Sequence, residues 1–130
     1  MLSQKSQENI SSAELLLNQG YFNSVPHCAY YACFQLLMNI KGQHIPPTNG
    51  EGSHDDTINT VYKDLKKDDK KHQCKYKFNL TPFQIKEKIQ RIKSVRMIAD
   101  YGNSNMIEPD KAEECINESK EIIKILNHFY

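Results

Sequence analysis

One arginine stands out among the side chains that could do chemistry, because it lies within an apolar helical stripe. Residues 81–101 carry apolar side chains at helical spacing, namely Ile85, Ile89, Ile92 and Ala99. At about 100° per residue, Arg96 falls in the middle of this stripe and Asp100 follows one turn later. A guanidinium does not lose its proton, so it needs paired acceptors wherever it is buried. Arg96 is therefore the first candidate for a functional residue.

Three interpretations of Arg96 are open. In the first, Asp100 pairs with it along the helix while its stem lies on the apolar surface and its head reaches water. In the second, Arg96 lies at a subunit interface. In the third, it faces a cleft and binds a phosphate, because the planar fork of arginine matches phosphate oxygens. The last two are compatible, and we favour them because a charge centred on an apolar stripe is more often functional or interfacial.

Two adjacent tyrosines, Tyr30 and Tyr31, form a second candidate. Aromatic faces stack on nucleic-acid bases without sequence preference. Adjacent helical residues point about 100° apart, so one tyrosine can lie in the core while the other lies at an interface. Core packing or a dimer contact is the more common use of such a pair.

Other reactive groups form no recognisable site. His27, Cys28 and Cys33 lie close in sequence, but the spacing of the two cysteines places them on different faces of a helix. No C-x-x-C or H-E-x-x-H pattern occurs, and the chain lacks the glycine-rich loops that hold nucleotide phosphates. We therefore predict no metal ion and no cofactor.

The elements that position these residues follow from apolar periodicity and helix-end signals. We predict helices over roughly residues 3–18, 24–42, 55–67, 81–101 and 108–129, with loops at 43–53 and 68–77. Pro26 fits the second helix if Asn23 is its N-cap, and Thr81 followed by Pro82 is typical of a helix start. No segment shows a sustained period of two, so no sheet is expected. The prediction is an all-α, four- to five-helix up-and-down bundle.

Residues 63–77 are rich in lysine, with seven Lys against three Asp. Such a run is usually a solvated segment, and we expect residues 68–77 to form a mobile loop. Its alternative role is to steer RNA toward a cleft, which would make binding sensitive to salt.

Length and composition limit the classes of protein to which this chain can belong. The 130 residues fit one domain, residues 1–130, with 38% hydrophobic and 25% charged residues. Lys and Arg number 17 against 16 Asp and Glu, a net charge of +1, so any nucleic acid must be held by a local patch. No stretch is long and apolar enough to span a bilayer, and residues 1–8 do not resemble a signal peptide. We therefore expect a cytoplasmic protein without membrane contact, whose cysteines are reduced thiols.

Two segments together resemble the HEPN (higher eukaryotes and prokaryotes nucleotide-binding) domain family. Residues 20–22 read Gly-Tyr-Phe and residues 29–34 read Ala-Tyr-Tyr-Ala-Cys-Phe, which is similar to the family's G-x-Y/F and A-Y-Y-A-x-F pattern. Residues 96–101, Arg-Met-Ile-Ala-Asp-Tyr, look like its later Arg-centred motif, and Ser53-His54 look like its Thr/Ser-His at the middle helix. The resemblance covers nearly the whole chain.

The resemblance implies a helical bundle that commonly dimerises, with the motif helices lining a shared cleft. Many family members are metal-independent ribonucleases, often toxins or phage-defence effectors, and others are accessory partners of small nucleotidyltransferases. The catalytic members have an arginine that binds the scissile phosphate, then four to six residues, then a histidine that helps to activate the ribose 2′-hydroxyl. From this resemblance we expect a homodimer, an RNA or nucleotide ligand and a nucleotidyltransferase partner.

This chain departs from the catalytic pattern. Tyr101 stands where the shortest form of the motif places the histidine, and the alternative alignment puts Ala99 there. Met97 replaces the polar residue that usually follows the arginine, and Asn103 stands where toxin members place a tyrosine. Histidine exchanges protons near neutral pH, whereas tyrosine titrates near about 10 and is a poor base at pH 7. Tyr101 can still donate a hydrogen bond, and His54 could enter from the middle helix and replace the missing group.

We therefore predict a binding module that holds RNA or a nucleotide through Arg96 without efficient cleavage, in a toxin–antitoxin or defence system or beside a nucleotidyltransferase. The candidate ligand-binding residues are Arg96, Asp100, Tyr30 and Tyr31. The alternative is a divergent metal-independent ribonuclease that uses Arg96 with Tyr101 or His54. A third interpretation makes Arg96 and Asp100 an ion pair of a dimer interface with no ligand.

Overall fold

The computed structural model describes residues 4–47, 53–102 and 106–130. Its helices are α1 (Gln4–Asn18), α2 (Val25–His44), α3 (His54–Leu65), α4 (Asp68–Phe78), α5 (Pro82–Tyr101) and α6 (Pro109–Phe129), and a short 3₁₀ helix (Phe22–Ser24) precedes α2. These ranges contain no strand, so the all-α prediction is confirmed, with six α-helices where four to five were expected. None of these helices is long and apolar enough to cross a membrane.

Two helices begin directly after a residue whose side chain caps the helix N-terminus. The side chain of Thr81 accepts a hydrogen bond from the backbone N–H of Gln84 at 3.1 Å, and the Gln84 side chain accepts one from the backbone N–H of Thr81 at 2.8 Å. This reciprocal capping box, with Pro82 in the first turn, starts α5. The side chain of Ser53 caps α3 by accepting from the backbone N–H of Asp56 at 3.0 Å. Both caps fix the ends of helices that carry candidate site residues.

The start of α2 differs from the prediction. The helix begins at Val25 with Ser24, not Asn23, as its N-cap. The side-chain oxygen of Asn23 instead accepts a hydrogen bond from the backbone N–H of Ile107 at 2.7 Å. This contact joins the start of α2 to the segment that leads into α6, and Pro26 still lies in the first turn.

Residues 68–77 belong to a helix, so the prediction of a loop there is wrong. Two aspartates lie in the first turn of α4 and two lysines in its last turn, an arrangement that suits the helix dipole at both ends. Asn79, in the left-handed conformation with a φ of 53°, ends the helix. Cys74 is the one residue that α4 buries, which explains why apolar periodicity did not reveal it.

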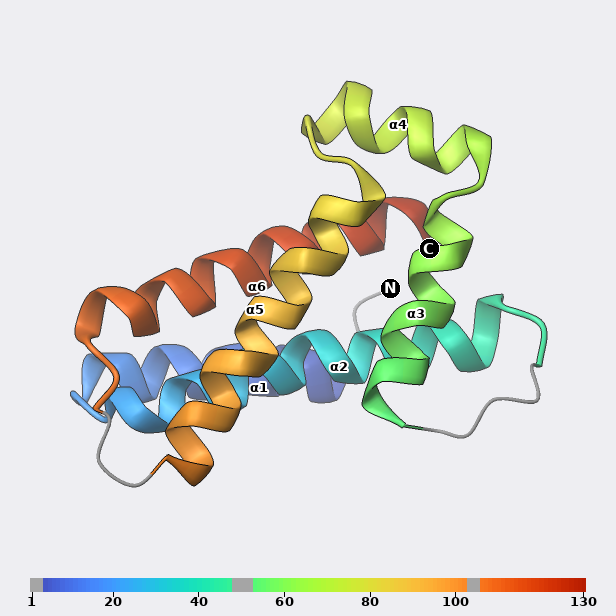
Figure 1. The fold of residues 1–130 in the computed structure, drawn as a ribbon. Coiled ribbons are helices and arrows are strands. Elements are labelled where there is room, and N and C mark those ends of the chain that lie inside the picture. The colour runs from blue at the N-terminus through green and yellow to red at the C-terminus, as the bar shows by residue number, and fades with distance from the viewer. Residues whose placement is uncertain (1–3, 48–52, 103–105) are drawn as a thin grey trace.

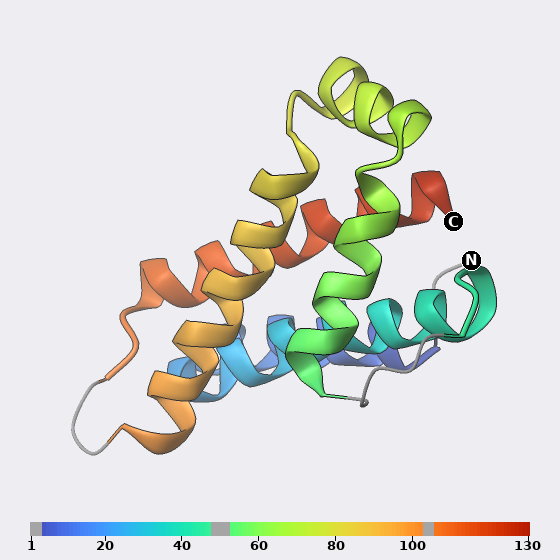
Figure 2. The same cartoon turned by 45° about the vertical axis from the view of Figure 1, so that its right-hand side comes forward.

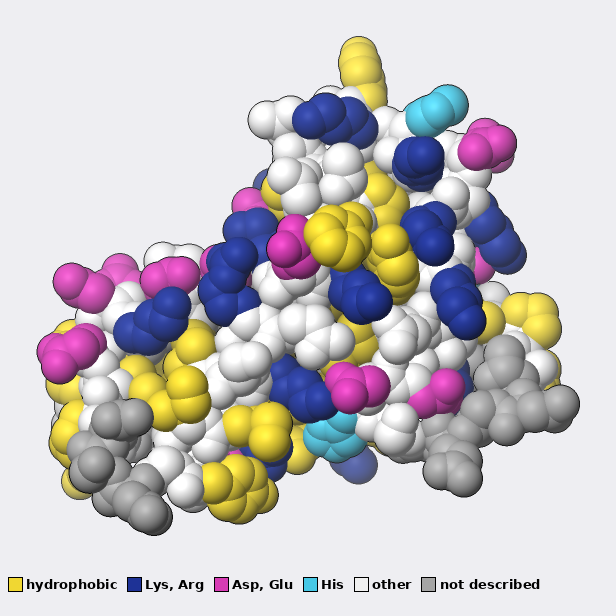
Figure 3. Space-filling view, viewed as in Figure 1, with side chains coloured by type: hydrophobic (Ala, Val, Ile, Leu, Met, Phe, Trp, Pro, Cys, Tyr) yellow, Lys and Arg dark blue, Asp and Glu magenta, His cyan; other side chains and the backbone are white. Residues whose placement is uncertain are grey.

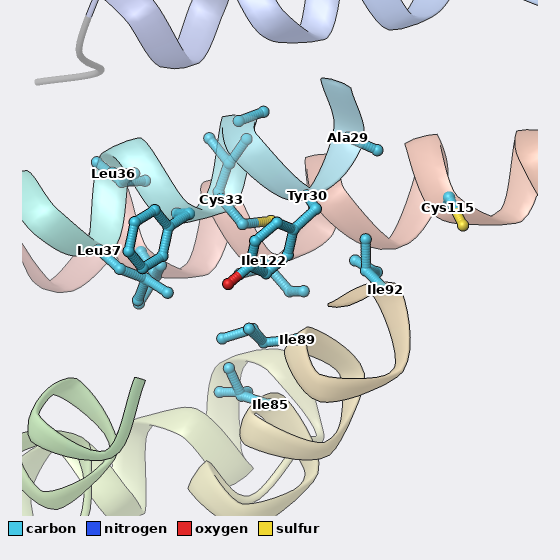
Figure 4. Close-up of a cluster of buried hydrophobic side chains, with 14 of the residues drawn as sticks. Ala29, Tyr30, Cys33, Leu36, Leu37, Ile85, Ile89, Ile92, Cys115 and Ile122 are labelled. Carbon is cyan, nitrogen blue, oxygen red and sulfur yellow. The ribbon is translucent and has the colours of Figure 1, made fainter. Parts of the chain in front are cut away.

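Helix α2 lies at the centre of the fold. It packs against α1, α3, α5 and α6, and α3 and α5 run side by side across it, while α4 joins them at one end (Figures 1 and 2). Buried side chains from α2, α5 and α6 meet in the core, among them Ala29, Leu37, Ile89 and Ile122 (Figure 4). This packing brings the first half of α2, the start of α3 and the last turns of α5 to one place.

The four cysteines are free thiols. Burial raises the pKa of Cys33 to about 12 and that of Cys74 and of Cys115 to about 11. The thiolate is the reactive form of cysteine, so these three side chains act as small apolar groups at neutral pH.

A buried carboxylate joins α4 and Tyr130 to the bundle. Asp64, near the end of α3, accepts a hydrogen bond from Lys70 at 2.5 Å and another from the hydroxyl of Tyr130. It also pairs with Lys67 at 3.0 Å. Burial alone would raise the pKa of Asp64, but the three donors outweigh it and lower the pKa to about 2. The carboxylate therefore stays charged in all but strongly acidic solution.

Replacing Asp64 with asparagine is expected to lower the free energy of unfolding by about 2 kcal/mol at neutral pH, since one pKa unit corresponds to about 1.4 kcal/mol. Because the folded-state pKa is depressed below its ordinary 3.8, the contribution is full above that value and is lost as the pH falls toward 2. Urea unfolding of both proteins near neutral pH and near about pH 2.5 measures this change.

The surface substitution Glu114→Gln on α6 is the control for Asp64→Asn. Glu114 forms only an exposed pair with Lys111, so its loss should change stability by less than about 0.5 kcal/mol. A difference between wild type and Asp64→Asn that does not shrink in acid would contradict the role given to Asp64.

Candidate functional site

Arg96, on α5, points toward α2 and has only 13% of its side chain exposed. Its Nε lies 2.9 Å from Oδ2 of Asp100, and a terminal nitrogen donates to the hydroxyl of Tyr31 at 3.3 Å. The Nε–H is not directed at the carboxylate and has no hydrogen-bond acceptor among the described residues. The ion pair of the first interpretation is present along α5, although we favoured the other two, and the guanidinium is largely covered rather than extended into water.

Two tyrosine rings flank this guanidinium. The central carbon of Arg96 lies 5.2 Å from the ring centre of Tyr31 and 5.6 Å from that of Tyr101. These distances are within the range of a cation–π interaction. Tyr101 is 70% exposed, so one aromatic surface beside the charge is open to solvent.

Asp100 connects Arg96 to a histidine of another helix. The Oδ2 atom that faces Arg96 also lies 3.1 Å from Nδ1 of His27, near the start of α2. The ring of His27 lies 4.8 Å from that of Tyr31, one turn further along α2. One carboxylate thus orients both an arginine and an imidazole, and 46% of the His27 side chain is exposed.

A second histidine enters from α3. Nδ1 of His54, the first residue of α3, lies 2.9 Å from the hydroxyl of Tyr30, and its ring stacks on Phe34 with centres 4.0 Å apart. Burial lowers the pKa of His54, and the nearby charges of Lys93 and Arg96 lower it further. His54 is therefore a neutral imidazole at pH 7, with Nδ1 held and Nε2 free to exchange a proton.

The two adjacent tyrosines have separate roles. Tyr30 is fully buried, and its ring stacks with Phe34 at 5.8 Å in the core. Its hydroxyl positions His54, and burial raises its pKa well above 10. Tyr31 is partly exposed and contacts Arg96 directly. Stacking on a base is thus open to Tyr31, whereas burial removes Tyr30 from that role and leaves it a positioning residue.

The outer edge of the site is also cationic. Nζ of Lys93 lies 2.8 Å from Oδ1 of Asp55, which follows His54 in α3. This pair closes the space between α3 and α5 and holds the pKa of Asp55 below its usual range, chiefly through the lysine hydrogen bond. No three His, Cys, Asp or Glu side chains of the described residues are grouped so that they could hold a metal ion. Lys93 and Arg96 thus bring two cationic groups to this surface, each paired with a carboxylate.

The sequence interpretation missed two members of this cluster, His27 and Lys93. His27 was considered only as a metal ligand, although it lies four residues before Tyr31 and hence on the same face of α2. Lys93 lies three residues before Arg96, also on a shared face. Helical spacing from the two strongest candidates would have found both.

Comparison with models of protein families shows to which family the chain belongs. The family model of the HEPN domain matches residues 1–129. The chain belongs to the HEPN domain family. Comparisons with curated proteins and with solved structures gave no match. Membership of the HEPN family associates the protein with nucleotides or RNA, and the predicted homodimer, nucleotidyltransferase partner and defence role stay predictions.

The HEPN motif keeps its arginine here and replaces its histidine. Both alignments of the motif leave α5 without the histidine, because they place Tyr101 or Ala99 at its position. Asn103, the residue at the place of the toxin tyrosine, lies outside the described residues. Instead, His27 from α2 and His54 from α3 approach the arginine from its two neighbouring helices. The imidazoles of this HEPN protein thus come from elements other than the one that carries Arg96.

Proposed function

We propose that this HEPN protein binds RNA or a nucleotide through Arg96, at the surface where α2, α3 and α5 meet. The observation that carries the proposal is the Arg96 guanidinium, which Asp100 and Tyr31 hold in place while 13% of the side chain stays exposed. Phosphate oxygens would face its terminal nitrogens, since the arginine fork matches phosphate geometry.

The surroundings of Arg96 support the same ligand. Tyr31 and Tyr101 present rings on which a base can stack, an interaction that contributes about 1–3 kcal/mol per base. Lys93 adds positive charge at the edge. Asp100 contacts Nε of Arg96 and thereby keeps the guanidinium oriented, and the same carboxylate also contacts His27.

We propose further that a second copy of the chain covers the surface beside this site. Besides Tyr101, three large apolar side chains are exposed on the last turns of α5 and on the segment after it: Met97, Ile98 and Met106. Grouped exposed apolar residues of this size are typical of protein interfaces. A homodimer through α2 and α5 would bury them and would place two Arg96 sites near each other.

Fluorescence anisotropy tests the binding proposal. A fluorescein-labelled single-stranded RNA of about eight nucleotides is titrated with the protein at low and at high salt. We expect saturable binding that weakens with salt and that AMP displaces, because AMP carries both a phosphate and a base. The absence of binding even at low salt would refute the proposal.

The two imidazoles favour a second candidate function, metal-independent cleavage of RNA. Nε2 of His54 and Nε2 of His27 form no hydrogen bond with described residues, and Arg96 lies between the helices that carry them. In such a reaction the ribose 2′-oxygen attacks phosphorus and His54 accepts its proton. The bond to the 5′-oxygen breaks and His27 protonates that oxygen, which leaves a 2′,3′-cyclic phosphate and a 5′-hydroxyl.

Cleavage of end-labelled RNA in the presence of EDTA tests this candidate. We expect His54→Ala and His27→Ala each to slow cleavage by about 100-fold or more, whereas His72→Ala on the exposed face of α4 leaves it unchanged. Because burial and the charges of Lys93 and Arg96 lower the pKa of His54, the acid limb of the pH–rate profile should lie below that of an ordinary histidine. Intact RNA with the wild-type protein would eliminate the candidate.

A further inference from the structure

A second group of aromatic and cationic side chains lies on α3 and α5, away from Arg96. The ammonium groups of Lys66 and Lys86 lie 4.6 Å and 4.7 Å from the ring centre of Tyr62. Phe83, at the start of α5, lies 6.4 Å from Tyr62 and is 54% exposed. We call these four residues the α3–α5 strip. In Figure 3, Lys and Arg side chains gather on α3 and on α5 of this face, with hydrophobic side chains between them.

The lysines of the strip are available to a ligand. Neither Lys66 nor Lys86 forms an ion pair with a carboxylate of the described residues, whereas Lys67, Lys70 and Lys93 do. Their ammonium groups rest on an aromatic ring, a contact that contributes only about 0.5–1 kcal/mol at exposed positions. A phosphate can therefore recruit both charges without breaking a salt bridge.

The strip continues to the candidate site along α5. Lys93 lies seven residues after Lys86 and therefore on nearly the same face, three residues before Arg96. At 1.5 Å per residue, Phe83 lies about 20 Å from Arg96 along the helix. The rise along the axis of a stacked strand is about 3.4 Å per nucleotide, so this length corresponds to about six stacked nucleotides.

We infer that the α3–α5 strip holds the continuation of a single-stranded RNA whose phosphate occupies Arg96, so that the ligand is a polynucleotide and not a mononucleotide. The inference rests on the proposed function. Lys66 and Lys86 contact backbone phosphates, and the exposed ring of Phe83 stacks on a base. The strip thereby supplies a part of the affinity that a mononucleotide at Arg96 does not use.

A length series gives the first test. Fluorescein-labelled oligouridylates of about two to twelve nucleotides are titrated by anisotropy at constant salt. We expect the affinity to rise with length up to about six nucleotides and then to level off. Equal affinity for the shortest and the longest oligonucleotide would overturn the inference while leaving binding at Arg96 intact.

Charge-neutral variants give the second test. The double variant Lys66→Gln/Lys86→Gln should bind the longest oligonucleotide about tenfold or more weakly and should lower the slope of log K against log salt by about 1.4, since each single-strand phosphate contact contributes about 0.7. The matched control is Lys120→Gln/Lys124→Gln on α6, where Lys120 pairs with Glu14 of α1. Both doubles should bind AMP as the wild type does.

Phe83→Leu separates base stacking from general attraction for anions. The variant keeps an apolar side chain. It should weaken binding of the longest RNA about fivefold without altering the slope of log K against log salt. If heparin or polyglutamate binds as tightly as RNA and responds equally to the lysine double variant, the strip is a surface for acidic partners and the inference is wrong. If wild type binds neither AMP nor RNA, the proposed function fails and the inference falls with it.

Discussion

Arg96→Ala is expected to weaken RNA binding by about 10- to 150-fold, the largest effect of any single substitution at the site. Hydrogen bonds to charged groups contribute about 1.5–3 kcal/mol, and each 1.4 kcal/mol is a factor of ten in affinity. The substitution removes both the fork that would face a phosphate and the charge between Tyr31 and Tyr101. Anisotropy with labelled RNA and with AMP as competitor measures the loss.

Two further variants show whether the loss of affinity comes from the planar guanidinium or from its charge alone. Arg96→Lys keeps the charge but not the planar fork, so it should recover only part of the affinity. Lys120→Ala on α6 removes a half-exposed cation paired with Glu14 and should leave binding unchanged. Equal losses from Lys120→Ala and Arg96→Ala would show that only overall charge matters.

Light scattering on Arg96→Ala separates ligand binding from assembly. If Arg96 and Asp100 serve only as an ion pair at a dimer interface, the variant should lose dimer mass and keep any nucleotide affinity. Our proposal expects the reverse, because Asp100 keeps its contact with His27 and the apolar side chains beside the site are untouched.

Tyr30→Ala is expected to lower the free energy of unfolding by about 3–5 kcal/mol, the usual range for truncation of a buried aromatic residue. Tyr30 is fully buried, and its ring packs against Phe34 while its hydroxyl holds His54. Because small domains have a total stability of about 5–15 kcal/mol, the variant should unfold at much lower urea concentration. Chemical unfolding followed by circular dichroism measures the difference.

The neighbouring tyrosine provides the matched comparison. Tyr31 is partly exposed, so Tyr31→Ala should leave the protein folded and weaken RNA binding, the opposite balance from Tyr30→Ala. Tyr30→Phe keeps the ring and removes only the hydrogen bond to His54, so it should cost about 1 kcal/mol. If Tyr30→Ala were as stable as Tyr31→Ala, the assignment of Tyr30 to the core would be wrong.

Most of the fold was predictable because most helices bury a regular apolar stripe. Helices α2, α5 and α6 repeat such residues over many turns, and their caps and prolines mark the starts. Helix α4 was missed because its stability comes from charges at its ends and from tertiary contacts such as that of Lys70 with Asp64. Contacts of this kind leave no periodic signal in the sequence.

The candidate site was predictable in part for a similar reason. Arg96 and Asp100 belong to one helix, so their spacing alone offered the ion pair that the structure shows, as one of three interpretations of Arg96. His27 and His54 reach the site only through packing between helices. Spacing within a helix does not show which helices pack together. Only the structure therefore revealed that Asp100 contacts both Arg96 and His27.

Side chains of three separate helices form this site, and this has a thermodynamic consequence. The contact of Asp100 with His27 spans 73 positions in sequence and that of Arg96 with Tyr31 spans 65, so the unfolded chain does not hold the complete site. A ligand that binds here binds only the folded protein, and at a concentration one hundred times its dissociation constant it adds about 2.7 kcal/mol to the unfolding free energy. Melting temperature is thus a direct readout of occupancy, and a panel of RNAs and nucleotides can be ranked without a label or an assay for activity.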